Sequence, residues 1–202
     1  MAAWLVGLAA FPVSILVDAP LSSLARGTAW PVMTRFLAAV TWLGYGLVDI
    51  AVFLGLAALA WWRADKARTM PAIYGAVLVA ASGLLNQVVK NLACRARPGA
   101  VGAGGFLAQF PCLAQGYALA SFPSGHATTA FCAAVILALW YPRVAPAVLP
   151  VAALVALSRV FLGAHFPSDV LAGALLGSGM ALAAYWLCAP LRKMPAREGG
   201  ER

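Results

Sequence analysis

Hydrophobic residues occur in six long runs, and most polar residues are confined to the segments between them. The runs show no alternation of polar and apolar positions, and lipid accommodates only helices and closed barrels, so each run predicts a helix. Most of the runs meet the roughly 20 residues that a helix needs to cross a hydrocarbon core of ~30 Å. The predicted helices cover approximately residues 2–17, 36–62, 71–92, 126–141, 145–163 and 169–188.

The pattern predicts an all-α fold: a polytopic membrane protein with six transmembrane helices in one bundle, forming a single domain over residues 1–202. The first run is short and ends before Asp18. We interpret it as a span, because no basic segment precedes it as in a signal peptide. Residues 18–35 are predicted to form an interfacial connector. Asp49 falls in the middle of the second run, where we favour a structural hydrogen bond over a role in lipid access.

Composition supports a membrane protein. Residues of the set AVILMFWYC make up 63% of the chain and charged residues only 10%, with a mean hydropathy of +0.89. Ordinary globular domains carry roughly 25% charged residues. The net charge of +8 does not indicate a nucleic-acid partner, because the cations lie singly or in threes between apolar runs. A nucleic-acid-binding protein gathers them on one face or tail.

The loop cations predict an orientation. Three lie within residues 63–68, one is Arg143, and four follow residue 188, so all eight share one face if the spans alternate. The positive-inside rule makes that face, and with it the C-terminus, cytoplasmic. Residues 93–125 and 164–168 then lie on the outer side. The composition fits a bacterial inner membrane, whose outer side is the periplasm.

Other polar residues gather at the outer ends of the predicted spans. Lys90 and Arg97 are seven positions apart at the end of the third span, nearly two helical turns, so both can face the same way if the helix continues that far. The others lie at the start of the fourth span, near the end of the fifth and around the start of the sixth: Ser124, Gly125, His126, Arg159, His165 and Asp169. The predicted orientation rests on other residues, the cations of the opposite loops. That these polar residues nevertheless all fall on the outer side indicates that they form one site.

This cluster predicts a phosphate-binding site. Ser124 and Ser168 each follow a proline and precede an apolar run, so both are N-cap candidates with free N–H groups beyond them. Gly125 has no side chain to block a ligand's approach to the backbone. Two guanidinium groups offer bidentate contacts to phosphate oxygens and one ammonium offers a point charge: Arg97, Arg159 and Lys90.

The histidines suggest a nucleophile and an acid. His165 and Asp169 are four positions apart, so the carboxylate can hold Nδ1–H and leave Nε2 free to attack. His126 could protonate a leaving oxygen. Asp169 is the single carboxylate placed in the cluster, whereas a magnesium site usually uses one or two carboxylates with waters. We therefore expect no metal and no other cofactor.

Three motifs resemble the type-2 phosphatidic-acid phosphatase superfamily. They are K-x6-R-P from Lys90 to Pro98, P-S-G-H from Pro123 to His126, and S-R-x5-H-x3-D from Ser158 to Asp169. All three are complete and in the family's order, and together they form a motif core over residues 90–169.

The resemblance implies a six-helix membrane phosphatase that acts without metal through a phosphohistidine intermediate. His165 would be the nucleophile, Asp169 its orienting partner and His126 the general acid. The phosphate oxygens would be held by Lys90, Arg97, Ser124, Gly125 and Arg159.

The expected reaction is hydrolysis of a terminal phosphate from a lipid at the outer leaflet. The lipid could be phosphatidic acid, phosphatidylglycerophosphate, undecaprenyl pyrophosphate or a lipid A phosphate, because the motifs bind only the phosphate. Two alternatives stay open: a lipid phosphotransferase that uses the same site, and a non-catalytic lipid or phosphate transporter.

Two of the four cysteines, Cys94 and Cys112, fall in the same outer loop. An oxidising periplasm would permit a disulfide between them, and we favour that bond over two unpaired thiols.

Overall fold

The computed structural model describes residues 2–28, 30–100, 105–106, 112 and 116–187, and all regular elements in these ranges are helical. The α-helices are α1 (Ala2–Leu16), α2 (Asp18–Gly27), α3 (Pro31–Val40), α4 (Gly46–Trp62), α5 (Lys66–Ala93), α6 (Gly125–Trp140), α7 (Ala145–Phe161) and α8 (Pro167–Leu187). The all-α fold class predicted from the sequence is confirmed.

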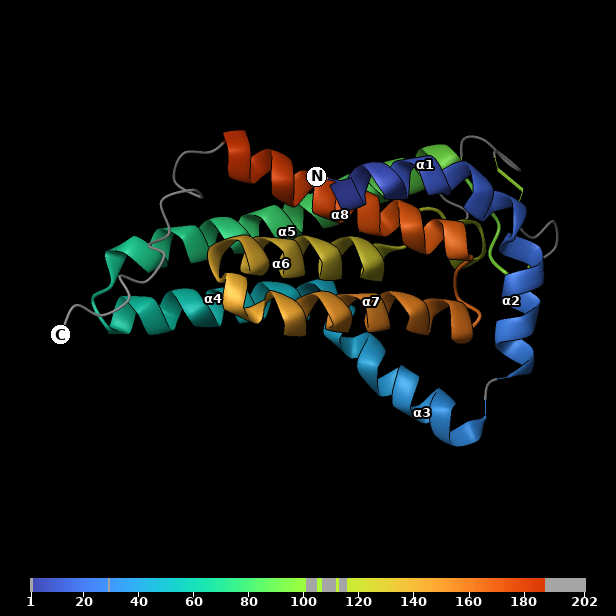
Figure 1. Ribbon diagram of the computed structural model, residues 1–202, viewed down its shortest axis with the longest axis horizontal. Helices are drawn as coiled ribbons and strands as arrows, with labels where there is room; N and C mark the ends of the chain where they lie inside the picture. The colour runs from blue at the N-terminus through green and yellow to red at the C-terminus, as the bar shows by residue number, and fades with distance from the viewer. Residues whose placement is uncertain (1, 29, 101–104, 107–111, 113–115, 188–202) are drawn as a thin grey trace.

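The long helices run side by side along one axis, with α6 in the middle (Figure 1). Helix α6 packs against α5, α7 and α8. It is apolar on all sides, as a helix enclosed by others is expected to be. Helix α2 lies across one end of the bundle and α3 slopes away from it (Figure 1). The predicted connector over residues 18–35 is thus largely helical.

Small residues allow α8 to approach α6 closely. A Cβ added at Gly177 would lie 2.0 Å from the carbonyl oxygen of Thr128, and one at Gly173 would lie 2.5 Å from that of Ser124. A pair of glycines four positions apart is a common means of close helix packing in membranes. This contact fixes the N-terminal ends of α6 and α8 next to each other, at the end of the bundle that α2 crosses.

The helices are long and apolar enough for an integral membrane protein. Among the described residues, three helical segments qualify as candidate spans by length and composition: 66–93, 142–161 and 167–187. The number rises to five if each of two bent pairs is one span. These pairs bend by 77° after Leu16 and by 54° after Gly44. Helix α6 has only 16 residues, and six spans stay a prediction.

Asp49 lies shortly after the second bend. The apolar run over residues 36–62 forms α3, a short 3₁₀ turn over Thr41–Gly44, and then α4. Asp49 therefore lies in the first turn of α4, close to the bend, and its side chain is buried.

Cys94 and Cys112, the pair that the sequence favours for a disulfide, are bonded in the structure, with their Cα atoms 5.7 Å apart. The bond connects the residue after α5 to a loop position 18 residues later. Cross-linking a loop of this length stabilises a fold by about 3 kcal/mol in the chain-entropy account.

We therefore expect the double variant Cys94→Ala/Cys112→Ala to have a lower thermal unfolding midpoint in detergent. The buried Cys132 is unpaired, so Cys132→Ala is a control for the loss of a cysteine as such. Mass spectrometry of the unreduced protein should find the two loop cysteines in one linked peptide pair. Two thiols that alkylate fully without reductant would contradict the bond.

Candidate active site

The predicted site residues come together at the end of the bundle where α5 and α7 end and α6 and α8 begin (Figure 1). Five of them are buried and three are half-buried. The cluster contains Lys90, Arg97, Ser124, Gly125, His126, Arg159, His165 and Asp169.

Lys90 and Arg97 meet, although not on one helix. Helix α5 ends at Ala93, and Cys94 adopts a left-handed conformation with φ of 45°, so Arg97 lies in the following loop. The two side chains nevertheless share an acceptor: Lys90 Nζ donates to the carbonyl oxygen of Ala120 at 2.8 Å, and Arg97 Nη2 donates to the same oxygen at 3.0 Å. The helix does not continue to Arg97, so the condition set for the two residues to share one helix face is not met, but the loop brings the two cations together.

Backbone carbonyls hold the Arg97 guanidinium in place. Nε donates to the carbonyl of Tyr117 at 2.8 Å and Nη1 to that of Ala164 at 2.7 Å, and the group lies 3.6 Å above the centre of the Tyr117 ring. Burial lowers the pKa of Arg97. Neutral carbonyls fix the guanidinium, and no carboxylate among the described residues forms an ion pair with it, so its charge stays available to an anion.

The N-terminus of α6 is the backbone part of the site. Ser124 is its N-cap residue, and its N–H donates to the carbonyl of Asp169 at 2.9 Å. Its Oγ is buried with no hydrogen-bond partner among the described residues and makes no cap bond. The N–H groups of the first turn, beginning at Gly125, have no intrahelical acceptor and form a binding surface for an anion.

Ser168 differs from the expectation of a second N-cap with free N–H groups. Helix α8 begins at Pro167, so Ser168 lies inside its first turn. Its N–H donates to Asp18 Oδ1 at 2.9 Å, and its Oγ also bonds to the Asp18 carboxylate. The acceptor comes from a residue 150 positions away, which no local pattern reveals.

Arg159 lies in the last turn of α7 and points toward the bend before α4. Its Nη1 donates to Thr41 Oγ1 at 2.9 Å, while its Nε is buried without a partner among the described residues. Its carbonyl accepts the N–H of His165 at 3.2 Å, which ties the backbone at the end of α7 to that histidine.

His165 lies in the loop between α7 and α8, and its two ring nitrogens have different surroundings. Nε2 lies 3.4 Å from Arg97 Nη1, among the cations, whereas Nδ1 lies 3.7 Å from Asp169 Oδ2. The second distance is longer than a hydrogen bond. Burial lowers the pKa of His165 from 6.5 to about 3; nearby Lys90 and Arg97 act in the same direction and Asp169 acts against them. The ring is therefore neutral near pH 7, as a nucleophile requires.

Asp169 is fully buried and held by three donors. Its Oδ2 accepts from Ser121 Oγ at 2.5 Å and from the N–H of Phe166 at 2.8 Å, and its Oδ1 accepts from Arg95 Nη1 at 2.5 Å. The carboxylate thus faces His165 with its position fixed by other groups.

His126 is the second residue of α6 and is half-buried. Its ring meets that of Tyr45 edge-on, with centroids 5.5 Å apart. Because it is the second residue of α6, its own backbone N–H is one of the first-turn donors.

Sequence reasoning missed Arg95 and Asp18. Arg95 lies between Lys90 and Arg97 inside the first motif, is only 1% exposed, and forms ion pairs with both Asp18 and Asp169. The one available signal was scarcity: the chain has six acidic residues, and Asp18 ends an apolar run.

The charges in and around this cluster suit a phosphate dianion. Four cations face two carboxylates, which leaves an excess of two positive charges in a buried setting: Lys90, Arg95, Arg97 and Arg159 against Asp18 and Asp169. In the described part of the chain, no group of three or more His, Cys, Asp or Glu side chains is arranged to hold a metal ion.

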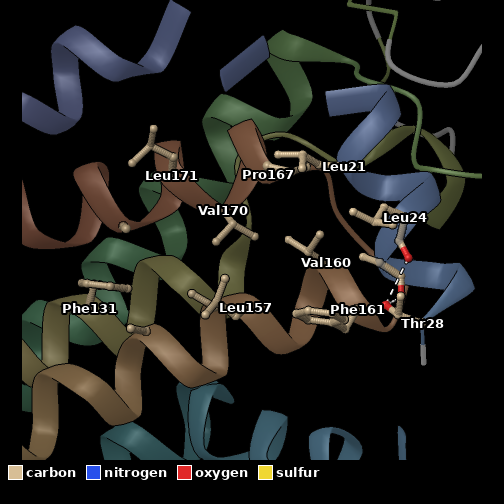
Figure 2. Close-up of a pocket in the computed structure, with 14 residues that line it drawn as sticks. Leu21, Leu24, Thr28, Phe131, Leu157, Val160, Phe161, Pro167, Val170 and Leu171 are labelled. Carbon is tan, nitrogen blue, oxygen red and sulfur yellow. Dashed lines mark hydrogen bonds between the residues drawn. The ribbon is translucent and has the colours of Figure 1, made fainter. Parts of the chain in front are cut away.

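An apolar pocket of about 630 Å³ lies between α2, α7 and α8. Figure 2 shows Leu21 and Leu24 of α2 on one side, with Val160 of α7 and Val170 of α8 on the other. None of the predicted site residues lines this pocket, so the polar cluster and the pocket are separate features.

Fold and site together define a helical membrane protein with a cluster of cationic side chains and two histidines at one end of its helix bundle. The chain belongs to the PAP2 superfamily, which it matches over residues 71–193, more than half of its length. The resemblance inferred from the three motifs is therefore confirmed.

Two relatives share parts of the sequence. A lipid A 1-phosphatase from Rhizobium johnstonii is 39% identical over 101 residues, which are 50% of this chain and 41% of that protein. A Bacillus licheniformis protein named bacitracin transport permease BcrC is 31% identical over 136 residues, 66% of this chain and 64% of that protein. The chain spans less than half the length of the first relative and less than two thirds of the second.

A solved structure shows the same fold. The crystal structure of a PAP2-type phosphatidylglycerolphosphate phosphatase from Bacillus subtilis superimposes with a TM-score of 0.71. The match covers 92% of this chain and 96% of that one, at 23% sequence identity.

Proposed function

We propose that this protein is an integral membrane phosphatase that hydrolyses the terminal phosphate of a lipid through a phosphohistidine intermediate. The observation that carries the proposal is the position of His165: Nε2 faces the Arg97 guanidinium and Nδ1 faces the Asp169 carboxylate. A neutral imidazole in this position can attack a phosphorus atom that the neighbouring cations hold.

The first step transfers the phosphoryl group. Lys90, Arg97, Arg159 and the N-terminus of α6 hold the phosphate oxygens, and Nε2 of His165 attacks phosphorus as the bond to the lipid oxygen breaks. The Asp169 carboxylate stabilises the positive charge that develops on the ring. His126 donates a proton to the departing lipid oxygen.

The second step regenerates the enzyme. His126, now neutral, accepts a proton from water, and the resulting hydroxide attacks the phosphohistidine. The nitrogen–phosphorus bond breaks, inorganic phosphate leaves, and His165 returns to its neutral form. Both steps balance without a metal or a cofactor.

A phosphorylated lipid is the expected substrate, because the site lies at the end of a bundle of membrane helices. The substrates predicted from the motifs are phosphatidic acid, phosphatidylglycerophosphate, undecaprenyl pyrophosphate and lipid A phosphates. The relative from Rhizobium johnstonii supports lipid A 1-phosphate as the first to test. Release of inorganic phosphate from each lipid by purified protein in detergent would rank them, and release from none would contradict the proposal.

The two alternatives make different predictions. A phosphotransferase would pass the phosphoryl group from His165 to an acceptor lipid, so product analysis with two lipids present would show a new phospholipid in place of free phosphate. The second alternative is a transporter, and the name of the Bacillus licheniformis relative is the reason to test it. A transporter would release no phosphate in detergent. The His165–Asp169 pair favours either enzyme over a transporter, because transport has no need of a nucleophile.

Metal removal should leave the activity intact. All the charge stabilisation in the proposed reaction comes from side chains and backbone N–H groups, so we expect full turnover in EDTA. Vanadate should inhibit, because it can adopt the five-coordinate geometry of phosphorus in the transition state of phosphoryl transfer. Loss of turnover in EDTA that is restored by added magnesium would contradict the phosphohistidine mechanism.

The site is expected to face the periplasm of a bacterial inner membrane, with the C-terminus in the cytoplasm. Ala118, near the site, and Ala67, in the first turn of α5, are both exposed alanines and form a matched pair. In a background without native cysteines, Ala118→Cys should react with an impermeant maleimide added to intact cells, and Ala67→Cys should not. The reverse pattern would place the site in the cytoplasm.

A further inference from the structure

Asp18 is a carboxylate outside the motif core that reaches into the site from α2. It is the first residue of that helix and is only 4% exposed. Its carboxylate accepts three hydrogen bonds, from the N–H and Oγ of Ser168 and from Arg95 Nη2. Through these bonds α2 is attached to the first turn of α8, next to Asp169.

Arg95 connects the two carboxylates. Its Nη2 donates to Asp18 at 2.5 Å, and its Nη1 donates to Asp169 Oδ1 at 2.5 Å and to Ser168 Oγ at 2.7 Å. The guanidinium lies over the rings of Phe106 and Phe166, each centred 4.5 Å away. These two cation–π contacts, together with the hydrogen bonds, restrict the orientation of the group.

Stability alone is a weak reason for such a network. Moving charges out of water costs several kcal/mol for each ion, and well-packed apolar residues often stabilise a fold as well as a buried ion pair does. The network also fixes the position of the Asp169 carboxylate. Arg95 holds Asp169 Oδ1, while Ser121 and the backbone of Phe166 hold Oδ2, and Oδ2 is the oxygen that faces Nδ1 of His165.

We propose that Asp18 and Arg95 are positioning residues that hold the Asp169 carboxylate against His165 and so set the orientation of the nucleophile. This inference rests on the proposed function, because it needs His165 to be the attacking group. Neither residue is assigned contact with the phosphate: both oxygens of Asp18 face Ser168 or Arg95. Their loss should therefore slow the chemical step and leave phosphate binding unchanged.

Asp18→Asn tests this directly, because the amide oxygen can still accept from the Ser168 N–H while the negative charge beside Arg95 is lost. Ser22→Ala is a matched control: Ser22 lies one turn later in α2, is also buried, and its Oγ has no partner among the described residues. For each variant, kcat for lipid hydrolysis, the inhibition constant of inorganic phosphate and the thermal unfolding midpoint are measured in detergent.

We expect kcat of Asp18→Asn to fall by about 10–100-fold, the loss found when residues that orient the ligands of a catalytic metal are replaced, because Asp18 and Arg95 orient Asp169 in the same indirect way. The phosphate inhibition constant should stay at the wild-type value, and Ser22→Ala should behave as wild type. Three results would each overturn the proposal: an unchanged kcat, a parallel loss of kcat and phosphate binding, or an equal loss in Ser22→Ala.

If Asp18→Asn does not fold, Arg95→Lys is judged by the same measurements. Lysine keeps the positive charge but lacks the two guanidinium nitrogens with which Arg95 contacts Asp18 and Asp169 at the same time. Failure of both variants to fold would assign the network to folding and would also overturn the proposal. His165→Ala separates this inference from the proposed function. Turnover that survives in His165→Ala refutes the assignment of His165 as the nucleophile, whereas an inactive His165→Ala with a fully active Asp18→Asn refutes only the positioning role.

Discussion

Replacement of His165 by alanine should abolish turnover of every phosphorylated substrate, because no covalent intermediate can form. Loss of a nucleophile reduces kcat by about 10⁶-fold in a well-studied covalent hydrolase. The phosphate-binding groups should remain, since Lys90 and the N-terminus of α6 are held by contacts outside the imidazole ring. Arg97 would lose its 3.4 Å contact with the ring and would keep its hydrogen bonds to three backbone carbonyls. The variant should therefore still bind inorganic phosphate.

Phosphate binding, measured by isothermal titration in detergent, is the control that separates lost chemistry from a lost site. An inactive variant that binds phosphate normally supports the nucleophile. Residual turnover of a few per cent would contradict it, because a direct attack by water would then have to account for that rate.

Replacement of His126 by alanine should have an effect that depends on the leaving group. A lipid alcohol leaves poorly as an alkoxide, so loss of the general acid should slow phosphorylation of His165 by about 10²–10⁴-fold. A nitrophenolate is stable without a proton near neutral pH, so the same variant should lose much less on p-nitrophenyl phosphate. The comparison uses the burst phase, which reports phosphorylation of His165. The steady-state rate is less informative, because it also contains the release of phosphate from His165, a step that both substrates share.

Wild-type turnover of p-nitrophenyl phosphate is the control that the small substrate reaches the site. Equal losses in the burst phase for both substrates would contradict the role of His126 as the acid. Inactive His126→Ala together with an active His165→Ala would show that the two roles are reversed.

The sequence was sufficient to predict which polar residues gather at one end of the bundle, because the chain has few polar residues. With 10% charged residues and two histidines in 202 positions, each polar side chain at the outer end of a predicted helix was informative. Burial of a charge among membrane helices is costly, so such residues are retained for a purpose. The structure brings all eight of them to one end of the bundle.

The sequence could not predict how the site is held together. Arg95 is hidden inside a motif between two other cations, and its partners Asp18 and Asp169 are 77 and 74 positions away. Ser168 resembles an N-cap locally, but a carboxylate from α2 takes its N–H. These contacts depend on tertiary packing, which periodicity and local capping patterns do not encode.

Helix boundaries were the least predictable part of the fold. The run over residues 36–62 is continuous in hydropathy, yet the chain bends by 54° between Gly44 and Gly46. A Cβ at Gly44 would lie 2.3 Å from Val155, so the bend coincides with a close approach of this segment to α7. Apolar composition alone does not distinguish a straight span from two helices joined at such a contact.

Trapping of the phosphoenzyme tests the central proposal most directly. Purified protein is mixed with a lipid phosphate that it hydrolyses, quenched with denaturant at alkaline pH, where a nitrogen–phosphorus bond survives, and digested for mass spectrometry. The mechanism predicts a phosphoryl group on the peptide that contains His165, and none on that peptide in His165→Ala. A phosphoryl group on His126, or continued turnover with no phosphorylated residue, would contradict it.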